Sequence, residues 1–146
     1  MSARLVTIAL ALAIVAACGD PPTPNLLVTD QCRYDGPGTI IEGEARLTLQ
    51  RTGLGDYGAA VVRFPNGNEL SDLEALLEED TPIWENWPDW VQVRYLLEVN
   101  DDTVTSPQGN TVLMELQPDG YALVCINFSD ENAAVAATVE VVPDDD

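Results

Sequence analysis

The sequence contains no histidine and no lysine, and its six basic residues are all arginine. The lack of histidine excludes His-dependent catalytic triads, His-ligated zinc or haem, and a conventional blue-copper centre. The lack of lysine excludes Schiff-base catalysis and the P-loop lysine. The 25 acidic residues give a net charge of −19 at pH 7, so phosphate backbones would repel the chain and a nucleic-acid partner is excluded. Apolar residues make up 46% of the 146 positions, enough for the packed core of one domain.

The first 17 residues have the pattern of a signal peptide. Arg4 supplies a positive charge, and the run from Leu5 to Ala17 contains only small and apolar residues apart from Thr7. At about 1.5 Å per residue this run would form a helix about 20 Å long, shorter than the roughly 30 Å hydrocarbon core of a bilayer. The segment is therefore predicted to be an export signal and not a membrane-spanning anchor.

The end of this segment, Val15-Ala16-Ala17-Cys18, resembles the lipobox of bacterial lipoproteins. The resemblance implies that the Cys18 thiol receives a diacylglycerol, that the signal is cut before it, and that the new N-terminus is acylated, for example with palmitate. Several acyl chains give the stable anchoring that one chain does not. The protein would then sit on the cell membrane or outer membrane, with its domain facing the periplasm or the exterior. The alternative is an ordinary cleaved signal followed by a chance cysteine.

Beyond the signal, the composition divides the chain into three parts. Residues 18–25 hold three prolines and predict an extended tether. Residues 26–142 carry the apolar periodicity of a folded domain, and residues 143–146 form an acidic tail. Removal of the signal also removes Arg4, which leaves five arginines against 25 acids and a net charge of 5 − 25 = −20.

Two cysteines, Cys32 and Cys125, remain when Cys18 is set aside. An even number of cysteines in an exported domain predicts a disulfide between them. The alternative is two unpaired buried thiols that pack as small hydrophobes. A catalytic dithiol is disfavoured because there is no Cys-x-x-Cys spacing.

Alternating hydrophobicity and turn residues predict an all-β domain. In residues 90–99, five apolar side chains are expected on one face: Val91, Val93, Tyr95, Leu97 and Val99. In the last strand, Val135, Val139 and Val141 are likewise expected on one face. The full set of predicted strands is 26–29, 45–52, 59–64, 90–99, 111–117, 121–128 and 133–142.

One short helix is predicted between the strands. Ser71-x-x-Glu74 has the pattern of a capping box, and Leu73, Leu76 and Leu77 then share one face. Pro82 should end the helix near Asp80. Strands with this single insertion indicate a two-sheet β-sandwich.

The segment Leu116-Gln117-Pro118-Asp119-Gly120-Tyr121-Ala122-Leu123-Val124-Cys125 resembles the penultimate-strand signature of cupredoxins, the plastocyanin-type copper domains. Leucine, proline, tyrosine and cysteine match the family's spacing, and the glycine is displaced by one position. The resemblance implies a Greek-key β-sandwich in which Cys125 stands at the position of a copper ligand.

The other copper ligands of that family are missing. The first histidine is expected near Tyr57-Gly58, and the second histidine and the methionine in residues 127–132, but none of them is present. One thiolate with carboxylates does not reproduce a His₂Cys site. We therefore expect the scaffold of a cupredoxin without copper or any other cofactor.

Three tryptophans, Trp84, Trp87 and Trp90, recur at every third position. If exposed together, they would form a stacking platform for a sugar ring or for a neutral or cationic small molecule, with Glu85 and Asp89 as polar contacts. The alternative is that they cap one end of the core, since tryptophan is mostly buried.

The sequence therefore favours a non-catalytic, lipid-anchored cell-envelope protein that is an interaction or structural module. Its partners would be the membrane, through Cys18, and an envelope protein or a glycan. The alternative is a ligand-binding lipoprotein that uses the tryptophan stretch. We assign no catalytic residues and no metal ligands, because the acid clusters lack the spacing of a calcium loop and the sequence contains no recognisable catalytic constellation.

Overall fold

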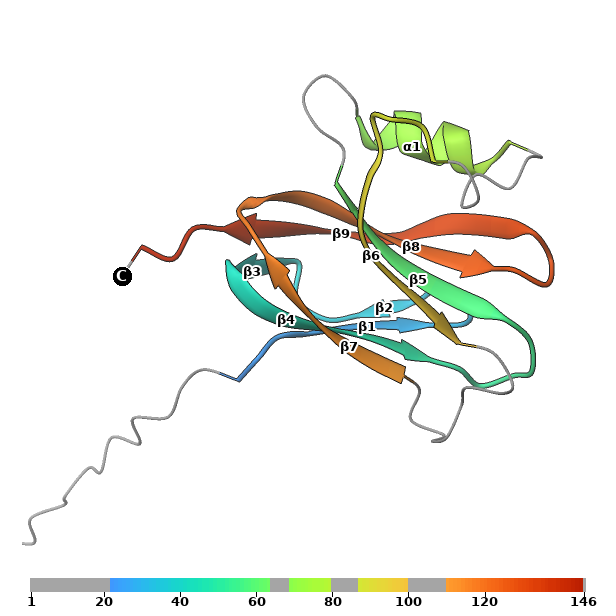
Figure 1. The fold of residues 1–146 in the computed structure, drawn as a ribbon, viewed down its shortest axis with the longest axis horizontal. Helices are drawn as coiled ribbons and strands as arrows, with labels where there is room; N and C mark the ends of the chain where they lie inside the picture. Colours follow the sequence, from blue (N-terminus) through green and yellow to red (C-terminus); the bar gives the residue numbers. More distant parts are fainter. Residues whose placement is uncertain (1–21, 64–68, 80–86, 100–109, 146) are drawn as a thin grey trace, which may run out of the picture.

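Two β-sheets packed face to face form the domain in the computed structural model (Figure 1). The structure describes residues 22–63, 69–79, 87–99 and 110–145. The first sheet has the strand order β2-β1-β4-β7, and the second has the order β3-β9-β8-β5-β6. The strands are β1 (Asn25–Thr29), β2 (Tyr34–Asp35), β3 (Thr39–Ile41), β4 (Gly43–Gln50), β5 (Tyr57–Arg63), β6 (Gln92–Val99), β7 (Asn110–Leu116), β8 (Asp119–Asn127) and β9 (Asn132–Val142).

The sheets are mixed, and the chain passes repeatedly from one to the other. β1 pairs in parallel with β4, and β3 in parallel with β9, whereas the remaining pairs are antiparallel. The connections β4–β5, β6–β7 and β7–β8 each cross between the sheets. The predicted all-β, two-sheet sandwich with one short helix is confirmed.

The two ends of the sandwich differ in what they carry. Residues 22–24 enter at the end where residues 143–145 leave, which we call the tether end (Figure 1). There the Arg46 N–H donates to the Pro24 carbonyl at 2.8 Å, and the Asp144 N–H donates to Glu42 Oε1 at 3.1 Å. The opposite end is formed by residues 30–33, 51–56 and 128–131, which we call the loop end.

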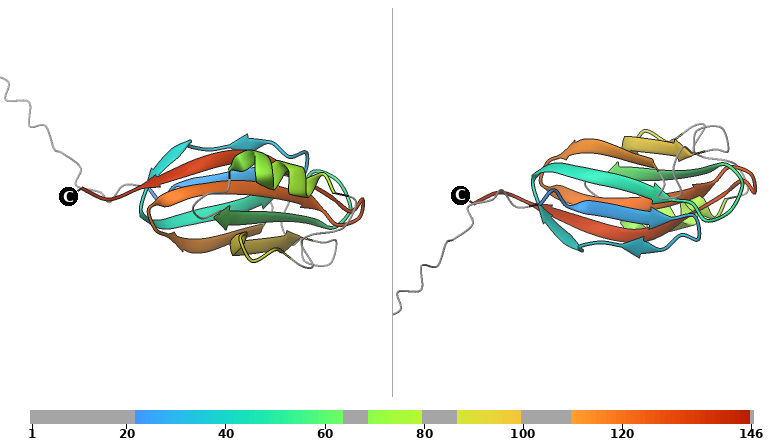
Figure 2. Two further views of the ribbon diagram at one scale, coloured as in Figure 1. Left: turned by 90° about the horizontal axis from the view of Figure 1, so that it is seen from above. Right: turned by 90° about the horizontal axis from the view of Figure 1, so that it is seen from below.

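The second sheet is covered on both faces. Alternate side chains of β5 and β8 point into the space between the sheets, among them Ala59, Val61 and Leu123. The others, such as Val62 and Val124, form a second apolar cluster on the outer face. Helix α1 (Leu70–Leu77) lies over this outer face (Figure 2). β5 and β8 are therefore buried on both sides, which explains their nearly continuous apolar sequences.

β-bulges correct the predicted faces of two strands. The pairing of β5 with β6 runs from Val61↔Tyr95 directly to Val62↔Val93, so that Arg94 is skipped. Val91 and Val93 consequently pack with the outer cluster, whereas Tyr95, Leu97 and Val99 belong to the inter-sheet core. The prediction that all five share one face was wrong, because an inserted residue reverses the alternation.

The same correction applies to the last strand. The pairing of β8 with β9 skips Ala136 between Val124↔Val135 and Leu123↔Ala137. Val135 therefore faces the outer cluster, and Val139 and Val141 face the inter-sheet core.

The N-cap of the helix lies two residues before the predicted one, Ser71. It is Glu69, whose backbone is extended at φ −107° and ψ 165°, and Asp72 Oδ2 accepts the Glu69 N–H at 2.7 Å. The capping box is thus formed by Glu69 and Asp72 and not by Ser71 and Glu74. The predicted apolar face is confirmed, since Leu73 and Leu77 are buried and Leu76 packs against the same cluster. The helix ends at Leu77, and Asp80 lies outside the described residues.

Candidate functional site

A disulfide between Cys32 and Cys125 closes the loop end of the sandwich, as predicted. Cys125 lies on β8, paired with Ala59 of β5 and Ala134 of β9, and Cys32 lies on the turn after β1. The Cα atoms are 5.5 Å apart, and the bond links positions separated by 93 residues. Cys32 has a φ of 58°, in the left-handed region that a residue with a Cβ rarely adopts. The turn is therefore held in place by the bond to the sheet.

The positions that the cupredoxin resemblance assigns to metal ligands meet around this disulfide. Tyr57 pairs with Asn127 across β5 and β8, two residues along the strands from the Ala59–Cys125 pair. A cavity of about 230 Å³ lies over the disulfide and is lined by Tyr57, Gly58, Asn127 and Asn132. The positions that the resemblance assigns to copper ligands thus lie close together, but the side chains at these positions are not those of a copper site.

Copper does not fit this set of residues. No histidine exists anywhere in the 146 positions, and the sulfur of Cys125 is already bonded to Cys32. Within the four described ranges, no group of three or more Cys, Asp or Glu side chains is arranged to hold a metal ion. The cavity offers amide, phenol and disulfide groups in place of the imidazoles and thiolate of a blue-copper site.

Asp30 braces the loop end from the turn after β1. One of its carboxylate oxygens accepts the N–H groups of Thr52 at 2.7 Å and Gly53 at 2.9 Å, and the Thr52 hydroxyl donates to the other at 3.0 Å. Partial burial raises the pKa of Asp30, but these hydrogen bonds together outweigh it and hold the pKa below its usual value. The carboxylate is therefore a structural acceptor that fixes the loop between β4 and β5.

The loop between β8 and β9 supports the same segment from the other side. The Asp56 N–H donates to Ser129 Oγ at 3.2 Å, and the Phe128 N–H donates to the Asp56 carbonyl at 2.9 Å. Arg51 Nη1 donates to the Gly55 carbonyl at 2.8 Å within the β4–β5 loop itself. Three separate loops are thereby tied into one rigid surface.

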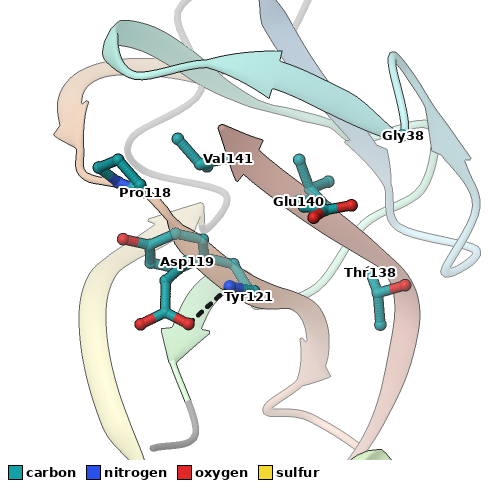
Figure 3. A pocket seen from close by; sticks show the side chains of 9 residues that line it. Gly38, Pro118, Asp119, Tyr121, Thr138, Glu140 and Val141 are labelled. Carbon is teal, nitrogen blue, oxygen red and sulfur yellow. Dashed lines mark hydrogen bonds between the residues drawn. The ribbon is translucent and has the colours of Figure 1, made fainter. Parts of the chain in front are cut away.

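A second, open groove of about 630 Å³ lies near the tether end, beside β8 and β9 (Figure 3). Pro118, Asp119, Tyr121 and Glu140 are among its lining residues. Gly120 also lines the groove, and a Cβ placed there would meet nothing within 4 Å, so there is room for a side chain at this position.

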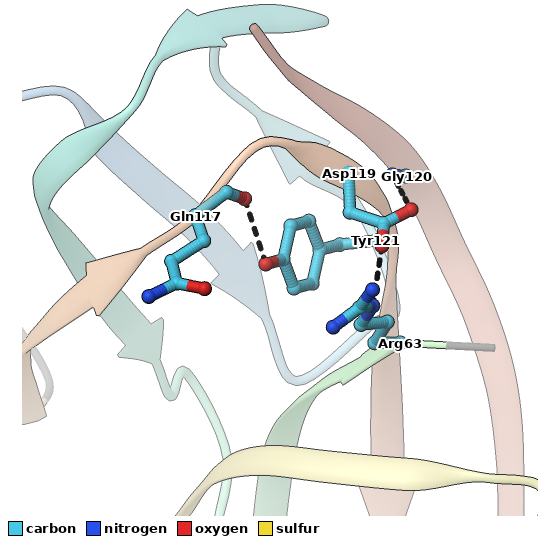
Figure 4. A network of polar contacts seen from close by, with 5 residues as sticks. All are labelled: Arg63, Gln117, Asp119, Gly120 and Tyr121. Carbon is cyan, nitrogen blue, oxygen red and sulfur yellow. Dashed lines mark hydrogen bonds and ion pairs between the residues drawn. The ribbon is translucent and has the colours of Figure 1, made fainter. Parts of the chain in front are cut away.

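The polar contacts beside this groove are structural (Figure 4). The Arg63 guanidinium forms an ion pair with Asp119, whose Oδ1 also accepts the Gly120 N–H at 2.7 Å. The buried Tyr121 hydroxyl donates to the Gln117 carbonyl at 2.8 Å. The Pro118-Asp119-Gly120-Tyr121 segment therefore closes the turn between β7 and β8.

The tryptophan stretch lies partly outside the described residues, which do not include Trp84, Glu85 or Cys18. Trp87 and Trp90 are half-buried and pack against the outer apolar cluster beneath helix α1, while Asp89 is exposed. The structure thus brings two of the three indoles into the core, and the predicted binding role of the stretch stays a prediction.

Leu54 is a residue that the sequence patterns did not single out. It lies in the β4–β5 loop with 83% of its surface exposed, more than Ile41, Leu113 or Leu96, the other large exposed hydrophobic residues of the described part. The available signal was its position between Gly53 and Gly55, a leucine in an otherwise polar turn segment.

Comparisons with known proteins give one likeness of fold. No protein-family model matches the chain, and no curated protein matches it. Among solved structures, the chain is similar to reduced auracyanin from the photosynthetic bacterium Roseiflexus castenholzii, with 15% identity, 82% of this chain and 95% of that chain covered, and a TM-score of 0.42. This similarity is too low to support a conclusion about function.

The fold and the loop end define a disulfide-braced β-sandwich whose residues do not fit a blue-copper centre. In the part of the chain that the structure describes, no helix is long and apolar enough to cross a membrane.

Proposed function

We propose that the protein is a non-catalytic, lipid-anchored component of the cell envelope whose copper-free, cupredoxin-like domain is an interaction or structural module. The observation that carries this proposal is the bond between Cys125 and Cys32. It occupies the sulfur of the cysteine that the sequence resemblance assigns to copper. The cross-link braces the same end of the fold without a metal.

The position of the tether end supports the anchoring part of the proposal. Cys18 is four residues before Pro22, where the described chain begins. At about 3.3 Å per extended residue, these four residues span at most about 13 Å. An acylated Cys18 would hold the tether end near the headgroups and direct the loop end away from the membrane.

Acylation is tested by labelling cells that express the full chain with an alkyne analogue of palmitate. Wild-type protein should be labelled, and the Cys18→Ser variant should lose the label and the membrane association. The matched control is the double variant Cys32→Ser/Cys125→Ser, which removes the other two cysteines and should keep the label. Wild-type protein without label, or label that persists in Cys18→Ser, would refute the anchor.

The copper-free part is tested separately by adding copper to the purified full chain. We expect less than about one tenth of an equivalent of retained metal after desalting, and no intense thiolate-to-copper absorption band. Stoichiometric copper would contradict the proposal. The control is the same protein treated with a thiol reductant, which shows whether the disulfide alone excludes the metal.

A further inference from the structure

We propose that the loop end is a preformed docking surface for a protein that has an apolar pocket bordered by arginine or lysine, and that Leu54 enters this pocket. The inference rests on the proposed role as an interaction module and names the surface and the chemistry of the partner. It depends on the exposure of Leu54, on the rigidity of its loop and on the charges around it.

Leu54 is displayed at the apex of its loop. Its side chain is 83% exposed, and it lies between two glycines. Gly55 has a φ of +122°, and a Cβ there would come within 3.3 Å of Ser129 Oγ and 3.4 Å of the Tyr57 ring. The backbone can therefore make this turn close against the β8–β9 loop only because Gly55 has no side chain. This geometry directs the leucine away from the sandwich.

A single exposed leucine is common on protein surfaces, but this one is held on a fixed backbone. On one side of the apex, the Asp30 carboxylate accepts hydrogen bonds from the Thr52 and Gly53 N–H groups. On the other side, the Gly55 carbonyl accepts from Arg51, and the Asp56 N–H donates to Ser129. The disulfide anchors the turn that carries Asp30 to β8. An anchor side chain on a rigid loop loses little conformational entropy when it binds, which increases affinity.

The charges around Leu54 select the chemistry of the partner. Asp56, Asp130 and Glu131 are exposed on the two loops that meet beside it. The loop end also carries two arginines, the exposed Arg33 and Arg51, which donates to the Gly55 carbonyl. The chain as a whole has no lysine and a net charge of −19. Acidic proteins and anionic lipid surfaces would be repelled, whereas a pocket with basic residues at its rim would be attracted and oriented. A lipid surface is therefore the less favoured occupant and is one outcome of the test.

The test measures binding of a designed probe to the full chain in nanodiscs of zwitterionic lipid. The probe is a structured miniprotein with one leucine-sized apolar pocket bordered by four arginines, labelled for fluorescence anisotropy. Two matched probes replace the arginines with glutamates or fill the pocket with a phenylalanine. Leu54→Asp is the test variant, and Leu113→Asp is its control, since Leu113 is also exposed but lies on the face of the first sheet.

We expect the arginine-rimmed probe to bind wild type and Leu113→Asp equally and Leu54→Asp at least about tenfold more weakly. The two matched probes should bind wild type at least about tenfold more weakly as well. Asp30→Ala should weaken binding although Leu54 is intact, because it releases the loop. Melting curves of each variant confirm that it is folded.

The inference is overturned if Leu54→Asp and wild type bind the probe equally, if the glutamate probe binds as well as the arginine probe, or if Leu54→Asp only changes adhesion to protein-free lipid. It also fails if Leu113→Asp weakens binding as much as Leu54→Asp. The lipid anchor is tested independently by palmitate labelling. If wild-type protein is not labelled, the same binding assay is carried out with the chain in solution instead of in nanodiscs.

Discussion

Tyr121 links the sequence signature to a specific hydrogen bond. Its side chain is 3% exposed, and its hydroxyl donates to the Gln117 carbonyl at the end of the β7–β8 turn. Tyr121→Phe leaves this carbonyl without its donor and should lower the free energy of unfolding by about 1–1.5 kcal/mol. The control is Tyr34→Phe, whose hydroxyl donates to Pro37 at a more exposed site and should lose less. Urea denaturation of both variants gives the comparison, and a larger loss in Tyr34→Phe would contradict it.

Asp30 predicts a dependence of stability on pH. Its pKa is lowered in the folded state, so its carboxylate stabilises the protein above the unfolded pKa of about 3.9. This contribution is lost as the pH falls through the lower, folded pKa. The difference in unfolding free energy between wild type and Asp30→Asn should therefore be largest near neutral pH and shrink below about pH 4. A difference that stays constant from pH 7 to pH 3 in urea denaturation would refute this role.

At the scale of elements, substitutions in the first turn of helix α1 distinguish the capping box of Glu69 and Asp72 from the predicted one of Ser71 and Glu74. Asp72→Ala removes the acceptor of the Glu69 N–H and should cost about 0.5–1.5 kcal/mol in unfolding free energy. Ser71→Ala, at the position favoured by the sequence pattern, should cost less than about 0.5 kcal/mol. Chemical denaturation of the two variants separates the possibilities. Equal losses, or a larger loss in Ser71→Ala, would restore the capping box predicted from the sequence.

Seven of the nine strands in the described residues, and the helix, were predictable because alternation and apolar spacing are local properties. The short strands β2 and β3, of two and three residues, were not predicted. The two β-bulges were not, since Arg94 and Ala136 carry no pattern that marks them as inserted residues. The side on which Val93 or Val135 packs depends on the register with a neighbouring strand, which is a non-local property. The cap was misplaced for a related reason: Ser71 and Asp72 are adjacent, and backbone geometry at Glu69 decides which residue closes the first turn.

The disulfide was predictable from the cysteine count together with the expected export of the domain. The meeting of Tyr57, Cys125 and residues 127–132 followed from the cupredoxin resemblance. The role of Leu54 was not, because its exposure depends on how three loops meet. The three hydrogen bonds of Asp30 were likewise not predictable from a local sequence pattern, since the partner residues are more than 20 positions away in the sequence.

For the whole molecule, the disulfide is the largest single constraint. It joins positions 93 residues apart, and closing so long a loop in the unfolded chain corresponds to about 4.6 kcal/mol of stabilisation in the chain-entropy model. The double variant Cys32→Ala/Cys125→Ala should lose an amount of this order in guanidinium denaturation. A loss below about 1 kcal/mol would show that packing alone holds the loop end together.

The excess of acid predicts a response to salt. At about 0.01 M salt the screening length is about 30 Å, comparable to the domain, and at 0.15 M it is about 8 Å. Because 25 acids face six arginines, the melting temperature should rise between these two concentrations as self-repulsion is screened. An unchanged or lower melting temperature would show that the carboxylates are too far apart to repel one another appreciably.

The burial of β5 and β8 on both faces has a kinetic consequence. The side chains of Ala59–Val62 and Ala122–Val124 are fully covered, between the first sheet on one side and helix α1 with its cluster on the other. The amide protons of these strands are expected to exchange with solvent only when the whole domain unfolds. In an amide hydrogen-exchange experiment, deuterium should therefore enter these strands last, at the rate of global unfolding. The paired strands β5 and β8, which include Cys125, should then be the slowest-exchanging part of the domain. The disulfide is therefore attached to the strand that unfolds last.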